Sequence, residues 1–298
     1  MTANGSYRNF LDLTDFEGDD LRAILATSRK IKAERNGVHR GVGPLAGKVL
    51  AMIFEQPSTR TRISFDVGMR ELGGETLMLT GAEMQLGRGE TIADTARVLS
   101  RFVDAIMIRI LDHNDLRELA EAATVPVING LTKLSHPCQI MADLLTFEEH
   151  RGSIAGKSVA WTGDSNNVLA SWIHAAPRFD FELRIATPGE LAPPQDLIDA
   201  ARAKGGSIQV TTDPYEAVKG TDCVVTDCWV ASVERQHDTG KWRLWRDKNR
   251  RQRLSAGETP ASDFDYLVVA HNGKCAEALM RQASVPKLHR LLKTKFSC

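Results

Sequence analysis

The chain has 298 residues, of which 42% are hydrophobic and 26% are charged, and its formal net charge at pH 7 is zero. These values are ordinary for a folded globular protein and exclude a disordered, collagen-like or coiled-coil chain. The length predicts two domains. A membrane-spanning helix needs about 18 consecutive apolar residues, and runs such as the one at 49–54 are much shorter.

The N-terminal residues carry acids early and lack the apolar stretch of a secretory signal. The five cysteines contain no CxxC pair: Cys138, Cys223, Cys228, Cys275 and Cys298. An odd number of unpatterned cysteines in a chain of this length indicates reduced thiols, and neither a disulfide framework nor a zinc site. We therefore expect a cytoplasmic protein.

Strand-like and helix-like segments alternate along the first 230 residues. Apolar runs of strand length occur at 48–54, 105–110, 125–128, 157–162, 182–186 and 222–227. Helical spacing begins at Ser58 and recurs at 91–102, 115–123 and 137–151. This alternation predicts an α/β fold with parallel sheets that helices cover on both faces. Ligands in such folds bind at the carboxyl ends of the strands.

The helix expected over 137–151 lies near the midpoint of this α/β region. We interpret it as the connection between two α/β domains, residues 1–149 and residues 150–298.

The segment 54–65, FEQPSTRTRISF, has the pattern of an anion site. A strand ends, Pro57 stops it, and Ser58 can cap the following helix. The free amides and the dipole of a first helical turn favour an anion, and guanidinium groups match phosphate oxygens. The hydroxyls and guanidinium groups of this turn belong to Ser58, Thr59, Thr61, Arg60 and Arg62. The alternative is a capped helix with surface arginines paired to acids, but this density of donors favours phosphate.

A second cluster, NGLTKLSHPCQ at 129–139, follows the strand expected to end at Ile128. His136 before Pro137 suits a fixed turn that presents an imidazole, although an isolated histidine is more often structural. Arg109 lies in the apolar run MIRI and needs an anionic or carbonyl partner, because a buried unpaired guanidinium is costly. Arg60, Arg109 and His136 converge only if their strands are neighbours, and they would then suit a phosphate joined to a carbonyl.

Three motifs together resemble the carbamoyl-phosphate domain of the aspartate/ornithine carbamoyltransferase family: FEQPSTRTR at 54–62, MIR at 107–109 and HPCQ at 136–139. GDSNN at 163–167 and DCWV at 227–230 resemble the amino-acid domain of its ornithine branch. The resemblance implies two Rossmann-like domains with the active site in the cleft between them, and a homotrimer with shared active sites. It also implies carbamoyl transfer from carbamoyl phosphate to the δ-amine of ornithine, giving citrulline and phosphate, as in arginine biosynthesis.

Position by position, the resemblance implies that carbamoyl phosphate contacts Ser58, Thr59, Arg60, Thr61, Gln85, Arg109, His136 and Gln139. Of these, Gln85 matches a residue that the neighbouring subunit contributes. Asn167 and Asp227 match contacts to the α-carboxylate and α-amine region of ornithine.

The chemistry of these residues supports the same assignment. Charge grows on the carbonyl oxygen and on the leaving phosphate, so fixed cationic and hydroxyl donors are the expected catalysts, and no metal or organic cofactor is required. We assign catalysis to Arg60, Arg109 and His136. His136 and Arg109, with Thr61, polarise the carbonyl, and Arg60 neutralises the leaving group.

The resemblance ends at about residue 231, where Ala231 stands in place of the family's serine. The later family segment that supplies a cysteine is absent, and so is its late arginine. Residues 231–298 hold 14 Lys or Arg and 7 Asp or Glu, unlike the acidic remainder. WRLW at 242–245 and the stretch 265–270 have the composition of strands, and 246–253 that of a basic loop. We interpret this tail as a foreign or frame-altered segment that replaced the native C-terminus.

Three functions remain open. The intact phosphate turn favours an active enzyme of the ornithine branch, with carbamoyl phosphate and ornithine as its partners. The missing ornithine loop favours a carbamoyl-phosphate-binding paralogue with a lost or altered amino-acid substrate. A nucleic-acid-binding module would use the basic tail, but no recognition motif accompanies the charge. We expect the first, with no nucleic-acid or membrane partner.

Overall fold

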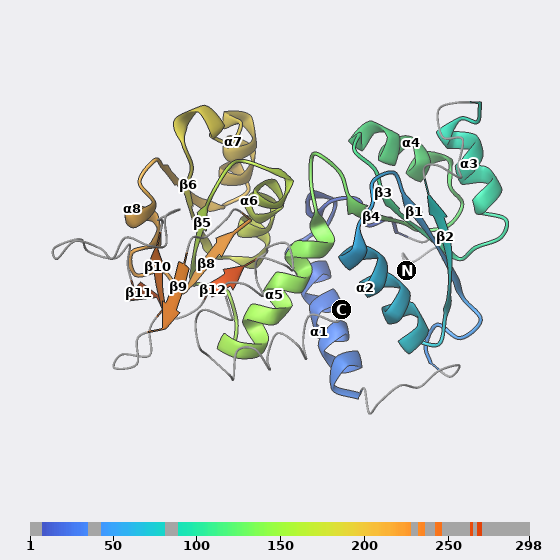
Figure 1. Ribbon diagram of the computed structural model, residues 1–298, viewed down its shortest axis with the longest axis horizontal. Helices are drawn as coiled ribbons and strands as arrows, with labels where there is room; N and C mark the ends of the chain where they lie inside the picture. Colours follow the sequence, from blue (N-terminus) through green and yellow to red (C-terminus); the bar gives the residue numbers. More distant parts are fainter. Residues whose placement is uncertain are drawn as a thin grey trace. The chain divides into compact units, whose positions relative to one another are not determined.

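The computed structural model describes residues 8–34, 43–80 and 89–227, together with the strands at 232–235, 242–245, 263–264 and 267–269. The chain divides into two compact units between Leu145 and Thr146. This division falls inside helix α5 (Pro137–Arg151), which has the bounds expected from the sequence. The expected α/β class is confirmed, because each unit contains a parallel sheet packed with helices (Figure 1).

The sheet of the first unit has the order β2-β1-β3-β4, and all of its strand pairs are parallel. Its strands are β1 (Val49–Phe54), β2 (Glu75–Thr80), β3 (Ala105–Arg109) and β4 (Val127–Leu131). Its other elements are η1 (Leu13–Asp15), α1 (Gly18–Glu34), α2 (Thr59–Glu71), α3 (Ile92–Leu99) and α4 (His113–Ala122).

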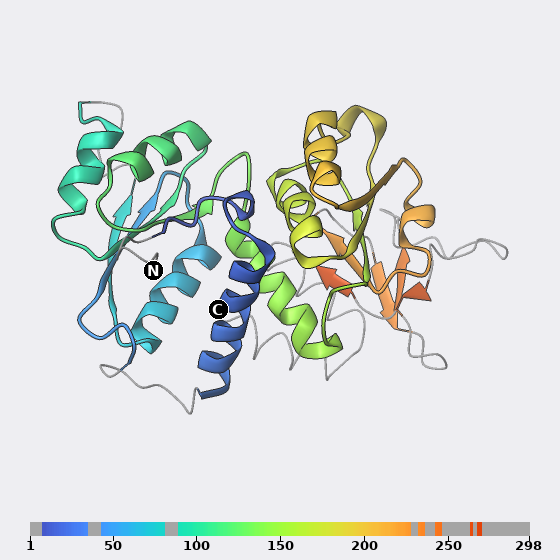
Figure 2. The ribbon, with the colours of Figure 1, turned by 180° about the vertical axis from the view of Figure 1, so that it is seen from behind.

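Strand β1 is buried on both faces, which explains its continuous apolar sequence. Ala51 and Ile53 face a core that includes α3 and α4. Leu50, Met52 and Phe54 face a second core, where side chains of α2 pack. Figures 1 and 2 show α2 on one side of the sheet and α3 with α4 on the other. The helices therefore cover both faces, as the sequence predicted.

The sheet of the second unit has the order β12-β8-β5-β6-β7, also parallel throughout. Its strands are β5 (Ser158–Thr162), β6 (Glu182–Ala186), β7 (Ser207–Thr211), β8 (Cys223–Thr226) and β12 (Leu267–Val269). Its helices are α6 (Asn167–Phe179), η2 (Gly189–Leu191), α7 (Gln195–Ala203) and α8 (Pro214–Val218). A small antiparallel sheet joins β9 (Ser232–Arg235), β10 (Trp242–Trp245) and β11 (Asp263–Phe264).

The tail takes part in this unit. The strand expected over 242–245 is present as β10, and the one expected over 265–270 is present as β12. Strand β12 pairs in parallel with β8, so the tail supplies an edge strand to the second sheet.

Strand β4 extends further than the sequence indicated, because Asn129 and Gly130 belong to the strand and not to the loop after it. A Cβ on Gly130 would lie 2.5 Å from Sδ of Met107 and 3.1 Å from the carbonyl oxygen of Ile108. Glycine therefore allows β4 to approach β3 closely at this point. The register also shifts between Ile108 and Arg109, so an irregularity in the pairing lies beside Arg109.

Among the helices that the structure describes, none is long and apolar enough to span a membrane.

Candidate functional site

The ends of three neighbouring strands bring the predicted anion-binding residues together. In the first sheet, Phe54 at the end of β1 pairs with Arg109 at the end of β3, and Arg109 pairs with Leu131 at the end of β4. Arg60 lies one position into α2, which follows β1. His136 lies in the loop between β4 and α5. The condition that these strands be neighbours is therefore met.

Ser58 occupies the N-cap position of α2 but makes no capping hydrogen bond to the helix backbone. Our expectation that its side chain caps α2 is wrong, because the Ser58 hydroxyl instead donates to Oγ1 of Thr61 at 3.0 Å. The same Thr61 oxygen accepts a hydrogen bond from Nη1 of Arg109 at 3.2 Å. The amides of the first turn of α2 are thus not capped by this side chain, which favours an external anion.

Positive groups dominate the electrostatics of this site. Burial, followed by the nearby charge of Arg60, lowers the pKa of Arg109 from its ordinary value. Burial, then Arg109 and Arg60, lowers the pKa of His136 to about 3. The imidazole of His136 is therefore neutral at pH 7. Both guanidinium groups raise the potential at the imidazole, so the three side chains share one electropositive region.

The acid at this strand end makes a hydrogen bond to the backbone. The Glu55 carboxylate, directly after β1, accepts a hydrogen bond from the Leu111 amide at 2.6 Å. Nε of Arg109 is buried and has no hydrogen-bond partner among the described residues. An anion or a carbonyl oxygen is the partner that this buried donor requires. Thr59 and Arg60 are exposed, and Ser58, Thr61 and Arg109 are half-buried, so a ligand can reach them.

Three buried polar residues fix the loop that carries His136, and we call Asn129, Thr132 and Ser135 the buried brace. Oγ1 of Thr132 accepts hydrogen bonds from the amides of Leu134 and Ser135, both at 3.2 Å. The Thr132 amide donates to the Ser135 carbonyl at 3.0 Å. Nδ2 of Asn129 donates to the carbonyl of Leu11 at 2.8 Å and to Oγ of Ser135 at 3.3 Å. The residue before His136 is therefore held from two sides.

The remaining residues of the HPCQ motif begin α5. Nε2 of Gln139 donates to Oδ1 of Asp143 at 2.8 Å, one turn further along the helix. The Cys138 thiol donates to the carbonyl oxygen of Asn129 at 3.4 Å, and burial raises its pKa to about 12. Gln139 is half-buried at the start of the helix.

In the second unit, the predicted amino-acid residues follow two neighbouring strands. Asp227 comes directly after β8, and the loop with Asn166 and Asn167 comes after β5, which pairs with β8. Nδ2 of Asn166 donates to Oδ2 of Asp227 at 3.0 Å. Asn167 is the first residue of α6 and is half-buried. Sequence reasoning selected Asn167 and missed Asn166, although an asparagine just before a helix is a recognisable N-cap.

Gln85 and the stretch 228–231 lie outside the described residues.

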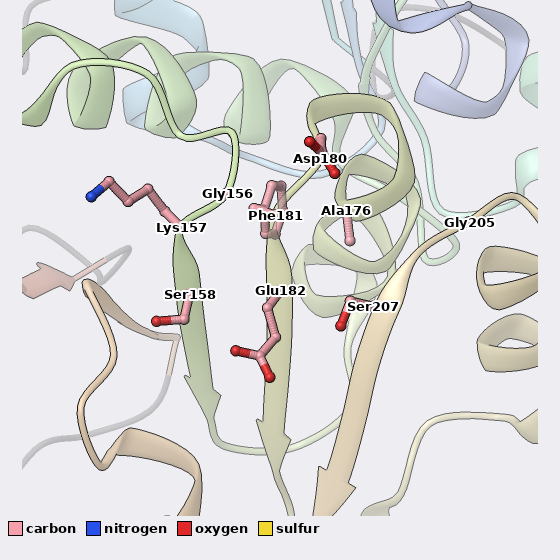
Figure 3. Close-up of a pocket in the computed structure, with 9 residues that line it drawn as sticks. All are labelled: Gly156, Lys157, Ser158, Ala176, Asp180, Phe181, Glu182, Gly205 and Ser207. Carbon is pink, nitrogen blue, oxygen red and sulfur yellow. The ribbon is translucent and has the colours of Figure 1, made fainter.

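A hollow of about 340 Å³ in the second unit lies at the opposite ends of the strands (Figure 3). It is lined by the first residues of β5, β6 and β7, including Ser158, Glu182 and Ser207. The Glu182 carboxylate accepts hydrogen bonds from Arg184 and Gln209, both at 2.7 Å. Its charge is already compensated, and the hollow is far from the strand ends where ligands bind in this fold.

Both units match models of one protein family. Residues 8–149 match the carbamoyl-phosphate-binding domain of aspartate/ornithine carbamoyltransferase, and residues 155–253 match its aspartate/ornithine-binding domain. The chain belongs to the aspartate/ornithine carbamoyltransferase family. The second match extends to residue 253, so our expectation that the resemblance ends at about residue 231 is wrong.

Relatives in this family bear names from its ornithine branch. The chain is 65% identical over 231 residues to an ornithine carbamoyltransferase of Rhodopseudomonas palustris, covering 78% of this chain and 74% of that protein. It is 59% identical over 269 residues to an ornithine carbamoyltransferase of Nitrobacter winogradskyi, covering 90% of this chain and 86% of that protein. The ornithine carbamoyltransferase structure from Pyrococcus furiosus has a TM-score of 0.69 and 46% identity, covering 75% of this chain and 72% of that one.

Proposed function

We propose that this protein transfers the carbamoyl group of carbamoyl phosphate to the δ-amine of ornithine, producing citrulline and phosphate. The observation that carries the proposal is the electropositive region of Arg60, Arg109 and His136, at the ends of adjacent parallel strands. The names of the family relatives support ornithine as the acceptor. In this proposal residues 1–149 bind carbamoyl phosphate and residues 150–298 bind ornithine.

The reaction forms a C–N bond and breaks a C–O bond. The neutral δ-amine attacks the carbonyl carbon, and negative charge develops on the carbonyl oxygen. The bond to the phosphate oxygen then breaks, and the proton that the amine gives up leaves with the phosphate. Arg109, the neutral imidazole of His136 and the Thr61 hydroxyl suit the developing charge on the carbonyl oxygen, because prearranged donors stabilise such charge best. Arg60 is exposed at the start of α2 and suits the departing phosphate.

The other residues complete the proposed site. Ser58 and Thr59 add donors at the start of α2, and Gln139 at the start of α5 contacts the carbamoyl group. In the second unit, Asn167 binds the α-carboxylate of ornithine and Asp227 binds its α-ammonium group.

The oligomeric state and the cellular compartment also belong to the proposal. We propose a homotrimer with shared active sites, because the family resemblance assigns Gln85 to the site of a neighbouring subunit. Sedimentation equilibrium measures this directly, and a monomer at assay concentrations would contradict it. Cys138 and Cys223 form no disulfide with any described residue, which supports a reducing compartment, the cytoplasm.

The decisive experiment is a citrulline assay with carbamoyl phosphate and ornithine. We expect turnover with ornithine and much less with aspartate or other amines. Calorimetric titration with carbamoyl phosphate accompanies it. Binding without turnover of any amine would favour the paralogue with a lost or altered acceptor, and absence of binding would contradict the proposed anion site.

A further inference from the structure

The Asn166 side chain joins two elements at the carboxyl ends of β5 and β8. Its Oδ1 accepts hydrogen bonds from the amides of Val168 at 2.9 Å and Leu169 at 3.2 Å, which caps α6. Its Nδ2 donates to Oδ2 of Asp227 at 3.0 Å. Two backbone donors occupy the oxygen end, so only the NH2 end of the amide can face the carboxylate. The helix cap thus fixes the direction of the donor.

The loop that carries Asn166 is itself held firmly. The Trp161 indole Nε1 donates to the Asp164 carbonyl at 3.2 Å, and the Ser165 amide donates to the Leu191 carbonyl at 3.2 Å. Trp161 is fully buried within β5. A donor anchored in this way restricts the carboxylate that it contacts, because a charge-assisted hydrogen bond defines both distance and direction.

We propose that Asn166 is a positioning residue for the acceptor: it holds the Asp227 carboxylate in the orientation that receives the α-ammonium group of ornithine. This inference rests on the proposed function, in which Asp227 binds that group. The family resemblance assigned the ornithine contact to the adjacent Asn167, whereas the contact to Asp227 comes from Asn166. Asn166 acts through Asp227 and need not touch the substrate.

A role as helix cap alone predicts a different outcome. Loss of an N-cap lowers stability by about 1 kcal/mol, and because Asn167 begins α6 it would raise the KM for ornithine only in variants that lose the capping oxygen. The positioning role predicts a rise in the KM for ornithine, with the KM for carbamoyl phosphate unchanged, because its residues lie in the first unit.

The substitution Asn166→Asp separates these two roles. Aspartate is as good an N-cap as asparagine, so the cap of α6 is kept. The NH2 donor is lost, and a second carboxylate faces Asp227. We expect the KM for ornithine to rise about tenfold or more, which corresponds to one charge-assisted hydrogen bond. We expect the KM for carbamoyl phosphate to stay close to that of the wild type, whereas repulsion between the two carboxylates lowers the melting temperature.

Two further measurements make the test independent of folding and of the chemical step. Asn166→Ser keeps a capping oxygen but is too short to reach Asp227, so it should reproduce the rise without adding a charge. L-2-Aminopentanoate has the α-amine and α-carboxylate of ornithine but no nucleophile. Its inhibition constant against ornithine should rise by the same factor as the KM. Asp213→Ala is the matched control, since Asp213 caps α8 in the same unit through the Tyr215 amide at 2.8 Å.

The outcomes separate the inference from the proposed function. Unchanged ornithine KM and inhibition constant in both Asn166 variants, with an active wild type, would overturn the positioning role alone. Equal rises in both KM values, or the same rise in Asp213→Ala, would also overturn it. A wild-type protein that forms no citrulline would overturn the proposed function itself. If Asn166→Asp does not fold, Asn166→Ser decides by the same readouts.

Discussion

The two units have the same arrangement of charged residues just before their central strands. In the first unit Lys48, just before β1, pairs with Asp104, just before β3, at 2.7 Å. In the second, Lys157 before β5 pairs with Asp222 before β8 at 3.4 Å. Each aspartate also accepts, at 2.9 Å, a hydrogen bond from the amide of the residue after the lysine. We call each of these arrangements an amino-end clasp.

At the carboxyl ends of these strands, the two units carry charged side chains of opposite sign. After β1 and at the end of β3, the first unit has Arg60 and Arg109. At the equivalent places after β5 and β8, the second unit has Asn166 and Asp227. Equivalent strand ends therefore present cations in one unit and a carboxylate with an amide in the other. The fold provides the location, and the side chains select an anion or an ammonium group as the ligand.

Removal of the Arg60 guanidinium group in the first unit should lower activity more than any other change. We expect Arg60→Ala to lower kcat/KM for carbamoyl phosphate by about 10³-fold, because a preorganised donor to developing charge is lost. Circular dichroism should show an intact fold. The control is Arg70→Ala on the same helix, where Arg70 is exposed and pairs with Asp66. Near-normal activity of Arg60→Ala would contradict the assignment of an anionic ligand to the strand ends of the first unit.

The converse change is made in the second unit. Asp227→Asn keeps the shape of the side chain but removes its charge. We expect the KM for ornithine to rise about 30-fold with little change in the KM for carbamoyl phosphate, because an ammonium group loses its counter-ion. Initial-rate kinetics with each substrate varied in turn measures both constants. Equal changes in the two constants would show that the units do not divide the substrates as proposed.

The buried brace offers a smaller, indirect effect within the first unit. Thr132→Val removes the oxygen that accepts two loop amides, so we expect a loss of about 1–3 kcal/mol in the free energy of unfolding. We also expect kcat to fall about tenfold, because His136 is less well placed. Thr132→Ser keeps the hydroxyl and should restore kcat. A stability loss without any fall in kcat would show that the loop does not position His136.

The neutral state of His136 makes stability depend on pH. Its native pKa is about 3 and its ordinary value is 6.5, so between these values the unfolded chain binds a proton that the native chain does not. The free energy of unfolding should therefore fall as the pH drops below 6.5, by at most about 1.4 kcal/mol per pH unit. His136→Gln removes this contribution. Urea unfolding of both proteins from pH 7 to pH 4 should give converging curves, and parallel curves would contradict the assignment.

The amino-end clasps should give the smallest effect, and the same one in each unit. Their charged groups are partly exposed, and such ion pairs contribute about 0.2–1 kcal/mol. We expect Lys48→Met and Lys157→Met each to lower the free energy of unfolding within this range, with both KM values unchanged. A change in either KM would mean that the two ends of the sheets are coupled.

The sequence predicted best those elements whose buried residues follow a regular spacing along the chain. Strands β1 and β6 match their apolar runs because both faces of these strands are largely buried. Helix α5 has the bounds expected from the sequence. Strand β2 (Glu75–Thr80) and helix α1 were missed. Strand β2 lies at a sheet edge and has no buried residue, and α1 buries only Leu21 and Leu25 of its 17 residues.

In the candidate site, too, the sequence predicted the features that lie close together in the chain and missed the long-range contacts. Dense donors within one turn, at residues 58–62, indicated the anion site, and their position at a strand end identified its place in the fold. The link between Asn166 and Asp227 spans 61 residues and arises only when β5 and β8 become neighbours. The role of Thr61 as acceptor for both Ser58 and Arg109 also depends on folding, because Arg109 is 48 residues away.

The environment of Cys138 has a consequence for the durability of the proposed catalytic loop. This thiol lies two residues after His136, and with a pKa of about 12 it carries almost no thiolate at physiological pH. Oxidants and electrophiles attack the thiolate. While the first unit remains folded, redox stress therefore has little means of modifying the segment that presents the imidazole.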